Sequence, residues 1–187
     1  MELFIRAAGP ADAEEIAAVQ RASWHATYAD MLRPESLARV ERVWDAAHWR
    51  GSLERTDDRI VPLVLDGRAT GVAGFGVAGP RRGGRLTPAA GFEGEIYLLY
   101  LMPGIQGYGH GGRLIAALAR VLRARSMKSA LVWALAANKS AIGFYRHLGA
   151  STVTTARKPF FGETVDEIAL GWDDLDVLAD TSRHLRK

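Results

Sequence analysis

A glycine-rich segment near the middle of the chain has the composition of an anion-binding loop. It reads Gln106-Gly107-Tyr108-Gly109-His110-Gly111-Gly112, between an apolar run and an amphipathic stretch. Between a strand and a helix, such a loop offers unobstructed backbone N–H groups and the positive end of a helix dipole, which together favour a phosphate group. The alternative is a plain turn that needs the conformational freedom of glycine.

The same glycines also match the dinucleotide fingerprint G-x-G-x-x-G, through Gly107, Gly109 and Gly112. In that motif the first glycine directly follows the strand, and an acidic residue stands about twenty positions later. Here residues 103–106 intervene, and the next expected strand continues as Trp-Ala-Leu-Ala at 133–136 without an acid. Both conditions fail, so the sequence disfavours a nicotinamide dinucleotide.

The elements that must position this loop indicate an α/β fold: a single domain with a mixed central sheet of about six to seven strands and about four flanking helices. Helices are expected over residues 12–28, 34–49, 111–125 and 138–147, and strands over 60–65, 71–78, 95–102, 130–135, 151–157 and 164–170. The domain is expected to span 1–172, followed by a polar tail at 173–187 that forms a helical or frayed appendage. Residues 79–94 are expected to form a long mobile hairpin loop, because they are rich in Gly, Pro and Arg.

Composition narrows the chemistry further. The chain has 187 residues, 48% of them hydrophobic, and no cysteine, so disulfides, thiolate metal sites and a cysteine nucleophile are excluded. No secretory signal is visible and the longest apolar run, 130–137, is far shorter than a membrane span. A cytoplasmic protein without a membrane partner is expected. A net charge of +3 is weak evidence for nucleic-acid binding, so no nucleic-acid partner is expected. No histidine has the spacing of a metal ligand, so no metal site is expected either.

Two segments in register carry a family resemblance. The pattern Gln106-x-x-Gly109-x-Gly111 resembles the Q/R-x-x-G-x-G/A motif of the GNAT superfamily of N-acetyltransferases. Residues 138–150 resemble that family's N-x-x-A-i-x-F-Y-r-x-x-G-F segment, with Ala150 where an aromatic residue is usual. The resemblance covers about residues 4–172 and implies a GNAT-like fold, acetyl-coenzyme A (acetyl-CoA) as cosubstrate and no metal.

The resemblance implies acetyl transfer to a primary amine of a small molecule or peptide by direct attack in a ternary complex. Tyr145 is then the general acid at the coenzyme sulfur, or alternatively a packing residue beside Phe144. Glu95 is the candidate general base, since it stands six residues before Leu101. Alternatively, Glu95 is an edge residue that faces solvent, and water acts as the base. A non-catalytic acyl-CoA-binding or regulatory module remains the alternative function, and a homodimer is left open.

Coenzyme contacts follow from the same resemblance. The seven residues of the glycine loop, His110 included, are expected to hold the pyrophosphate. Main-chain groups of Leu99, Tyr100 and Leu101 are expected to pair with the pantetheine amides, with the Leu101 N–H as oxyanion donor. Asn138 is expected to contact the pantetheine arm, although asparagine is also a favoured helix N-cap.

The acceptor cleft is expected between the first two helices and the last hairpin. Trp24 and Tyr28 lie four residues apart, so they share a helix face, and Phe160 lies in the hairpin. These aromatic rings could clasp an apolar or cationic amine. The alternative, favoured for Trp24, is core packing. The cluster Arg81, Arg82 and Arg85 is expected to be solvated rather than to bind an anionic acceptor.

Overall fold

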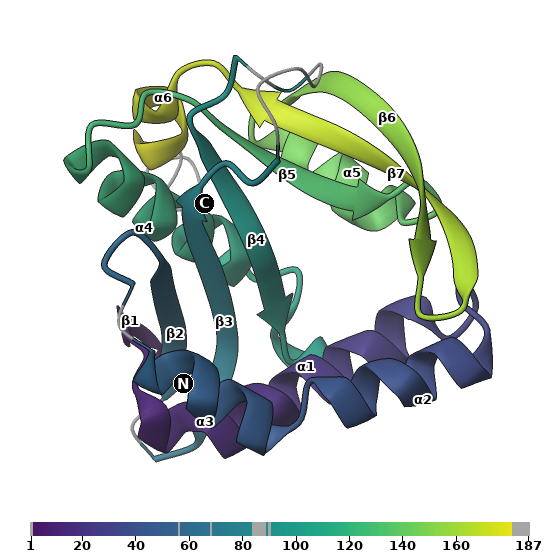
Figure 1. Cartoon of the computed structure of the whole chain (residues 1–187). Helices are drawn as coiled ribbons and strands as arrows, with labels where there is room; N and C mark the ends of the chain where they lie inside the picture. Colours follow the sequence, from purple (N-terminus) through teal and green to yellow (C-terminus); the bar gives the residue numbers. More distant parts are fainter. Residues whose placement is uncertain (1, 56, 68, 84–88, 90, 181–187) are drawn as a thin grey trace.

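The computed structural model describes residues 2–55, 57–67, 69–83, 89 and 91–180. The strands are β1 (Phe4–Ala7), β2 (Val61–Gly67), β3 (Gly71–Pro80), β4 (Gly94–Leu101), β5 (Ala130–Leu135), β6 (Ser151–Phe160) and β7 (Glu163–Trp172). The helices are α1 (Ala13–Tyr28), α2 (Pro34–Val43), α3 (Ala46–Glu54), α4 (His110–Ala124), α5 (Lys139–His147) and α6 (Leu175–Asp180), with short 3-10 turns at Pro10–Asp12 and Pro103–Ile105. The strands form one mixed sheet in the order β1-β2-β3-β4-β5-β7-β6, which confirms the expected α/β fold (Figure 1).

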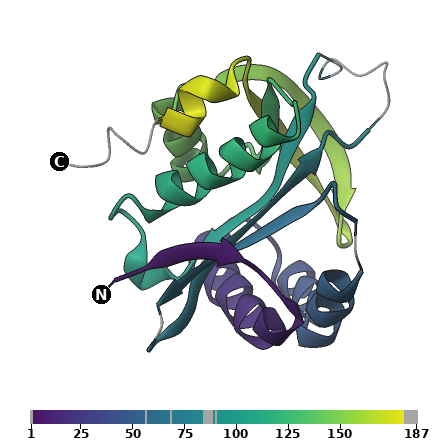
Figure 2. The same ribbon diagram turned by 90° about the vertical axis from the view of Figure 1, so that its left-hand side faces the viewer.

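The helices form two layers, one on each face of the sheet. Helices α1 and α3 pack on one face, around Ile16, Trp49 and Phe75. Helices α4, α5 and α6 cover the other face, where the largest apolar core contains Leu114, Leu118 and many neighbours. Figure 2 shows the sheet nearly edge-on between these layers. The amphipathic spacing of α4 explains its place, since its apolar stripe is completely buried.

The sheet opens in the middle, where β4 and β5 part. These strands pair in parallel over only three positions, from Gly94 opposite Ala130 to Ile96 opposite Val132. Beyond that point they diverge, and the two halves of the sheet spread apart (Figure 1). The register between β3 and β4 also shifts at this point, because Tyr97 is an extra residue in β4. Such a bulge bends its strand and re-aims the residues after it.

Two elements differ from the sequence expectation at the N-terminal side. The single helix expected over 34–49 is divided into α2 and α3, because Trp44 leaves helical geometry and Asp45 caps a new helix by accepting from the His48 N–H at 2.8 Å. Strand β1 was not expected. It is four residues long and pairs antiparallel with β2 at the edge of the sheet.

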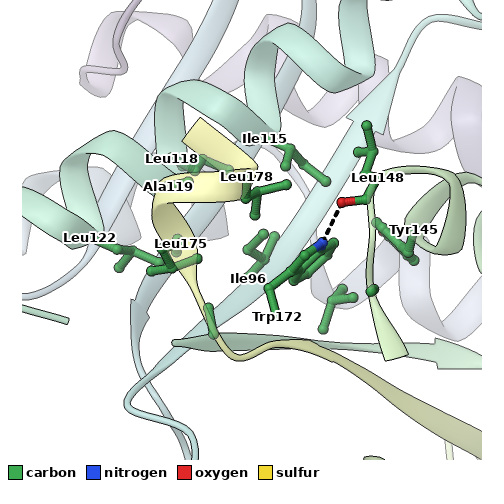
Figure 3. Close-up of a cluster of buried hydrophobic side chains, with 14 of the residues drawn as sticks. Ile96, Ile115, Leu118, Ala119, Leu122, Tyr145, Leu148, Trp172, Leu175 and Leu178 are labelled. Atoms are coloured by element: carbon green, nitrogen blue, oxygen red, sulfur yellow. Dashed lines mark hydrogen bonds between the residues drawn. The ribbon is translucent and has the colours of Figure 1, made fainter. Parts of the chain in front are cut away.

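The C-terminal segment also differs from the expectation. Helix α6 lies inside the region expected to be a polar tail, yet Leu175 and Leu178 are fully buried against α4 (Figure 3). Residues 175–180 therefore pack as part of the folded domain, while 181–187 lie outside the described residues.

The hairpin expected over 79–94 is shorter than predicted, because β3 continues to Pro80 and β4 begins at Gly94. Residues 84–88 and 90, and with them Arg85 of the expected arginine cluster, lie outside the described residues. Within the part of the chain that the structure describes, no helix has the length and apolar character needed to cross a membrane.

Candidate active site

A cavity of about 650 Å³ lies where β4 and β5 diverge. Its walls come from the end of α1, the second half of β4, the glycine loop and α5. The predicted site residues that line it are Tyr28, Leu99, Tyr100, Leu101, Gln106, Gly107, Gly109, Gly111, Gly112, Asn138 and Tyr145. Residues from four separate segments are thus brought to one space.

The glycine loop has the backbone geometry that required glycine. Gly107 and Gly109 both have φ of 81°, in the left-handed region, and Gly109 caps the N-terminus of α4. A Cβ on Gly111 would lie 3.1 Å from the Phe144 ring, so this glycine allows α4 to pack closely on α5. The loop therefore presents the N-terminal N–H groups and the positive dipole end of a fifteen-residue helix to the cavity.

Two residues of the loop lie away from the cavity. The Tyr108 side chain is 76% exposed and does not line it. His110 does not line it either, and its Nδ1 lies 3.3 Å from the Arg113 guanidinium, which donates to it. Burial and the nearby positive charge of Arg113 lower the pKa of His110, so this ring is neutral at pH 7 and adds no charge to the loop.

The backbone of β4 faces the cavity along its unpaired edge. The Met102 N–H donates to the Ala73 carbonyl of the β3 side at 2.8 Å. Because N–H groups alternate in direction along a strand, those of Leu99 and Leu101 point away from β3, to the side that β5 has left. The Gln106 amide donates to the Leu101 carbonyl at 3.4 Å, which joins the glycine loop to the strand.

Tyr145 is held in the cavity wall by aromatic packing. Its side chain is buried and meets the Trp172 ring edge-on, with centroids 6.0 Å apart. Trp172 is fixed in turn by its indole N–H, which donates to the Leu148 carbonyl at 2.9 Å (Figure 3). Burial, with a smaller effect of Tyr28, raises the pKa of Tyr145 well above 10, so its hydroxyl stays protonated. Within the described residues this hydroxyl has no protein hydrogen-bond partner.

Asn138 connects α5 with α1. Its Oδ1 accepts from the Ala141 N–H at 3.0 Å and so caps the helix, while the residue itself is 3% exposed. Burial raises the pKa of Tyr28, and a hydrogen bond with Asn138 acts in the opposite direction with smaller effect. Both sequence interpretations of Asn138 are therefore compatible with its position, because it caps α5 and also lines the cavity.

An aromatic cluster lies behind the wall of the cavity that α1 and β4 form. The Trp24 ring stacks on Phe160 at 5.9 Å and lies 4.7 Å from Tyr28 and 6.2 Å from Tyr100. Trp24 and Phe160 do not line the cavity, whereas Tyr28 and Tyr100 do. The packing interpretation of Trp24 therefore fits the structure, because its ring packs against both tyrosine rings.

The structure does not bring Glu95 into the cavity. Its side chain is 3% exposed and accepts from the Arg82 guanidinium at 2.6 and 3.0 Å and from the Arg82 N–H at 2.9 Å. Arg82 lies over the Tyr97 ring, 4.1 Å from its centre. Glu95 is thus neither a solvent-facing edge residue nor a free carboxylate in the cavity, because it lies at the opposite end of β4 from Leu101 as a buried carboxylate paired with the exposed Arg82 side chain.

Sequence reasoning missed Glu167. This β7 residue is 8% exposed, and its charge contributes to the raised pKa of both Tyr28 and Tyr100, two residues of the cavity wall. The strand alternation could have found it, since Glu167 shares a sheet face with Val165, which is buried beside Trp24. Across the described residues, no three acidic or histidine side chains are grouped so that they could hold a metal ion.

Comparison with known proteins places this geometry among acetyltransferases. The model of the acetyltransferase (GNAT) family matches residues 21–150. The chain is 29% identical to YuaI of Bacillus subtilis strain 168, an uncharacterized N-acetyltransferase, over 93% of this chain and 95% of that protein.

Solved structures agree on the fold. PaiA N-acetyltransferase from Thermoplasma acidophilum, in complex with coenzyme A, superposes with a TM-score of 0.70 at 18% identity, over 89% of this chain and 98% of that one. YncA from Salmonella typhimurium, solved with its cofactor acetyl-CoA, gives a TM-score of 0.67 at 20% identity, over 94% and 95% of the two chains.

Proposed function

Because the chain belongs to the GNAT family of acetyltransferases, we propose that it transfers an acetyl group from acetyl-CoA to a primary amine of a small molecule or peptide. One observation carries this proposal: a single cavity joins the glycine loop, the unpaired edge of β4 and the Tyr145 hydroxyl. As part of the proposal, the protein acts in the cytoplasm, without a metal, on a free amine rather than on nucleic acid or a membrane.

The residues of the cavity suit coenzyme A. The N–H groups of the glycine loop would hold the pyrophosphate, where the α4 dipole favours negative charge. The free N–H groups of Leu99 and Leu101 would pair with amides of the pantetheine arm, as an added strand does, and Asn138 would contact the same arm. The PaiA and YncA structures contain coenzyme A and acetyl-CoA respectively, which supports this choice of cosubstrate.

Two groups of this chain would assist the reaction. Acetyl-CoA supplies an acetyl thioester, which an amine nitrogen can attack directly. The Leu101 N–H would donate to the developing oxyanion, and the Tyr145 hydroxyl would give its proton to the departing thiolate. Because Glu95 is bound to Arg82 outside the cavity, water or the ionisation of the acceptor itself would remove the amine proton.

Release of free thiol from acetyl-CoA, measured against a panel of primary amines, tests the proposal. We expect release that depends on the amine, with formation of the N-acetyl product confirmed by mass spectrometry. Reactions without amine and with the matching alcohols are the controls. Coenzyme binding without thiol release for any amine would contradict the proposal and favour the non-catalytic acyl-CoA-binding module.

A further inference from the structure

A buried carboxylate, Glu167, forms an ion pair beside the aromatic cluster behind the cavity, and the proposed mechanism does not use it. The Lys158 Nζ of β6 lies 2.6 Å from the Glu167 Oε2 of β7. The carboxylate is 11% exposed, whereas the lysine side chain is 49% exposed and reaches Glu167 from the solvent side. Burying a carboxylate is costly unless a partner compensates its charge, so Glu167 needs a cation at this position.

The surroundings of Glu167 connect it to the cavity. Glu167 pairs with Leu135 of β5, one of the strands that form the sheet opening, and it lies on the sheet face that carries Val165 and the aromatic cluster. Its charge reaches the Tyr28 and Tyr100 hydroxyls, which line the cavity. Glu167 does not itself line the cavity, but a cation bound to it lies beside the aromatic cluster whose Tyr28 and Tyr100 side chains do.

Lys158 shows what kind of cation fits. Its end group is a primary ammonium on an alkyl chain, held beside the carboxylate and 5.9 Å from the centre of the Trp133 ring. Carboxylate and aromatic face are the two features that recognise an alkylammonium. The Glu167 Oε2 also lacks an aligned hydrogen bond, so the ion pair rests on charge and proximity. An incoming ammonium with better alignment could therefore replace Lys158.

We propose that Glu167 is the binding residue for the ammonium group of the acceptor, and that Lys158 is a resident cation which the acceptor displaces. This inference rests on the proposed acetyl transfer. The acceptor class it names is an alkylammonium, bound between Trp133 and the side chains of Tyr28 and Tyr100. Because Lys158 and the acceptor compete for one carboxylate, the two partners of the ion pair have opposite effects on acceptor binding.

This opposition separates the proposal from a purely structural ion pair. If the pair only stabilises the hairpin, removing either partner weakens the protein and affects amine binding in the same direction. The chain offers a matched control, since Arg157 and Asp166 form the neighbouring ion pair at 3.6 Å. They lie on the opposite face of β6 and β7 and are 75% and 67% exposed. Arg157→Met and Asp166→Asn should therefore leave amine binding unchanged.

The test titrates the full-length protein with n-butylamine, a positively charged analogue of the lysine side chain at pH 7, and follows the indole N–H signal of Trp133 by NMR. n-Butanol, which has the same length and no charge, is the ligand control. We expect Lys158→Met to bind n-butylammonium about ten- to hundredfold more tightly than the wild type, and Glu167→Gln to bind it more weakly by a similar factor. Lys158→Gln provides a second variant if Lys158→Met folds poorly.

Parallel changes in the two variants, or no Trp133 shift in either Lys158 variant, would overturn the proposal. For an amine that is acetylated, the KM for the amine should change in these same opposite directions, while the KM for acetyl-CoA stays constant. Failure of the proposed function is a separate result, because it would appear as n-butylammonium binding without thiol release from any amine.

Discussion

Three tyrosine hydroxyls converge on the cavity, and burial is the main cause that raises the pKa of each. They belong to Tyr28, Tyr100 and Tyr145, from α1, β4 and α5 respectively. A phenol with a raised pKa remains protonated across the neutral range and is therefore a hydrogen-bond donor, not an anion. The cavity wall thus contains three tyrosines that stay protonated at neutral pH.

Tyr145→Phe tests the general acid. The substitution keeps the ring that packs on Trp172 and removes only the O–H. We expect kcat to fall about 10- to 1000-fold with nearly unchanged acetyl-CoA affinity, as for other general acids. Because the pKa of Tyr145 is raised above 10, loss of its proton should cause no fall in rate below about pH 10. A variant with wild-type kcat would assign Tyr145 to packing alone.

Glu95→Gln tests whether Glu95 is a structural residue rather than the general base. We expect kcat within a few-fold of the wild type and an unchanged acidic limb of the pH–rate profile, because Glu95 does not line the cavity. Unfolding in urea should show a loss of about 1–3 kcal/mol, since the hydrogen bonds of a buried carboxylate are weakened. Arg82→Met should reproduce the stability loss. Disappearance of the acidic limb in Glu95→Gln would restore Glu95 as the base.

The sequence predicted which motif residues lie at the cavity, but not which side chains from distant segments form ion pairs. Tyr145 and Asn138 were predicted because two segments occur in fixed register, and both line the cavity. Glu95 and Glu167 depend on which cations reach them, and those are Arg82, thirteen residues away, and Lys158 on the neighbouring strand. Strand alternation could indicate that Glu167 faces inward, but not that Lys158 compensates its charge.

At the scale of elements, local signals found most helices and strands but not their breaks. Leu37, Val40 and Trp44 continue one helical stripe beyond the last residue of α2, so periodicity gave no sign of the break before α3. Asp45 is the residue that ends this continuity, because its capping of α3 competes with the helix before it. Strand β1 was missed because four residues carry too little periodic signal.

The junction of β1, β2 and the first 3-10 turn depends on an ion-pair network. Arg6 of β1 donates to both carboxylate oxygens of Asp12, at 2.7 and 2.8 Å, and to Asp66 of β2 at 2.7 Å. The hydrogen bond from Arg6 is the main cause that lowers the pKa of Asp12. A carboxylate with a lowered folded-state pKa stabilises the fold above its unfolded pKa, and loses this contribution as the pH falls toward its folded value.

Asp12→Asn should therefore destabilise the protein at pH 7 by about 1 kcal/mol, a modest value because Arg6 is 37% exposed and partly screened. The difference from the wild type should be constant above about pH 5 and shrink below it, since the unfolded pKa of Asp is about 3.9. Urea unfolding between pH 2 and 7 measures this. Asp57→Asn, which removes a surface ion pair with Arg59, is the control. A difference that grows toward acidic pH would contradict the assignment.

At the scale of the whole molecule, the two halves of the sheet are joined by only three paired positions between β4 and β5. The cavity occupies the opening beyond them. The halves are held together by the core of α4, α5 and α6, in which Gly111 allows close packing on Phe144. The fold class was predictable from the element order. The bulge at Tyr97 and the buried helix α6 were not, because both depend on contacts between distant segments.

The central claim is that this opening binds acetyl-CoA through the glycine loop. Isothermal titration with acetyl-CoA tests it most directly, in the wild type, in Gly109→Val and in Gly143→Ala. Valine is strained at the positive φ of Gly109, whereas Gly143 lies on the exposed side of α5 with open space around it, so alanine there should stabilise the helix by about 0.5–1 kcal/mol.

We expect wild type and Gly143→Ala to bind acetyl-CoA equally, with Kd below about 1 mM, and a folded Gly109→Val to bind at least about tenfold more weakly. Absence of binding by the wild type up to that concentration, or unchanged affinity in a folded Gly109→Val, would contradict the claim.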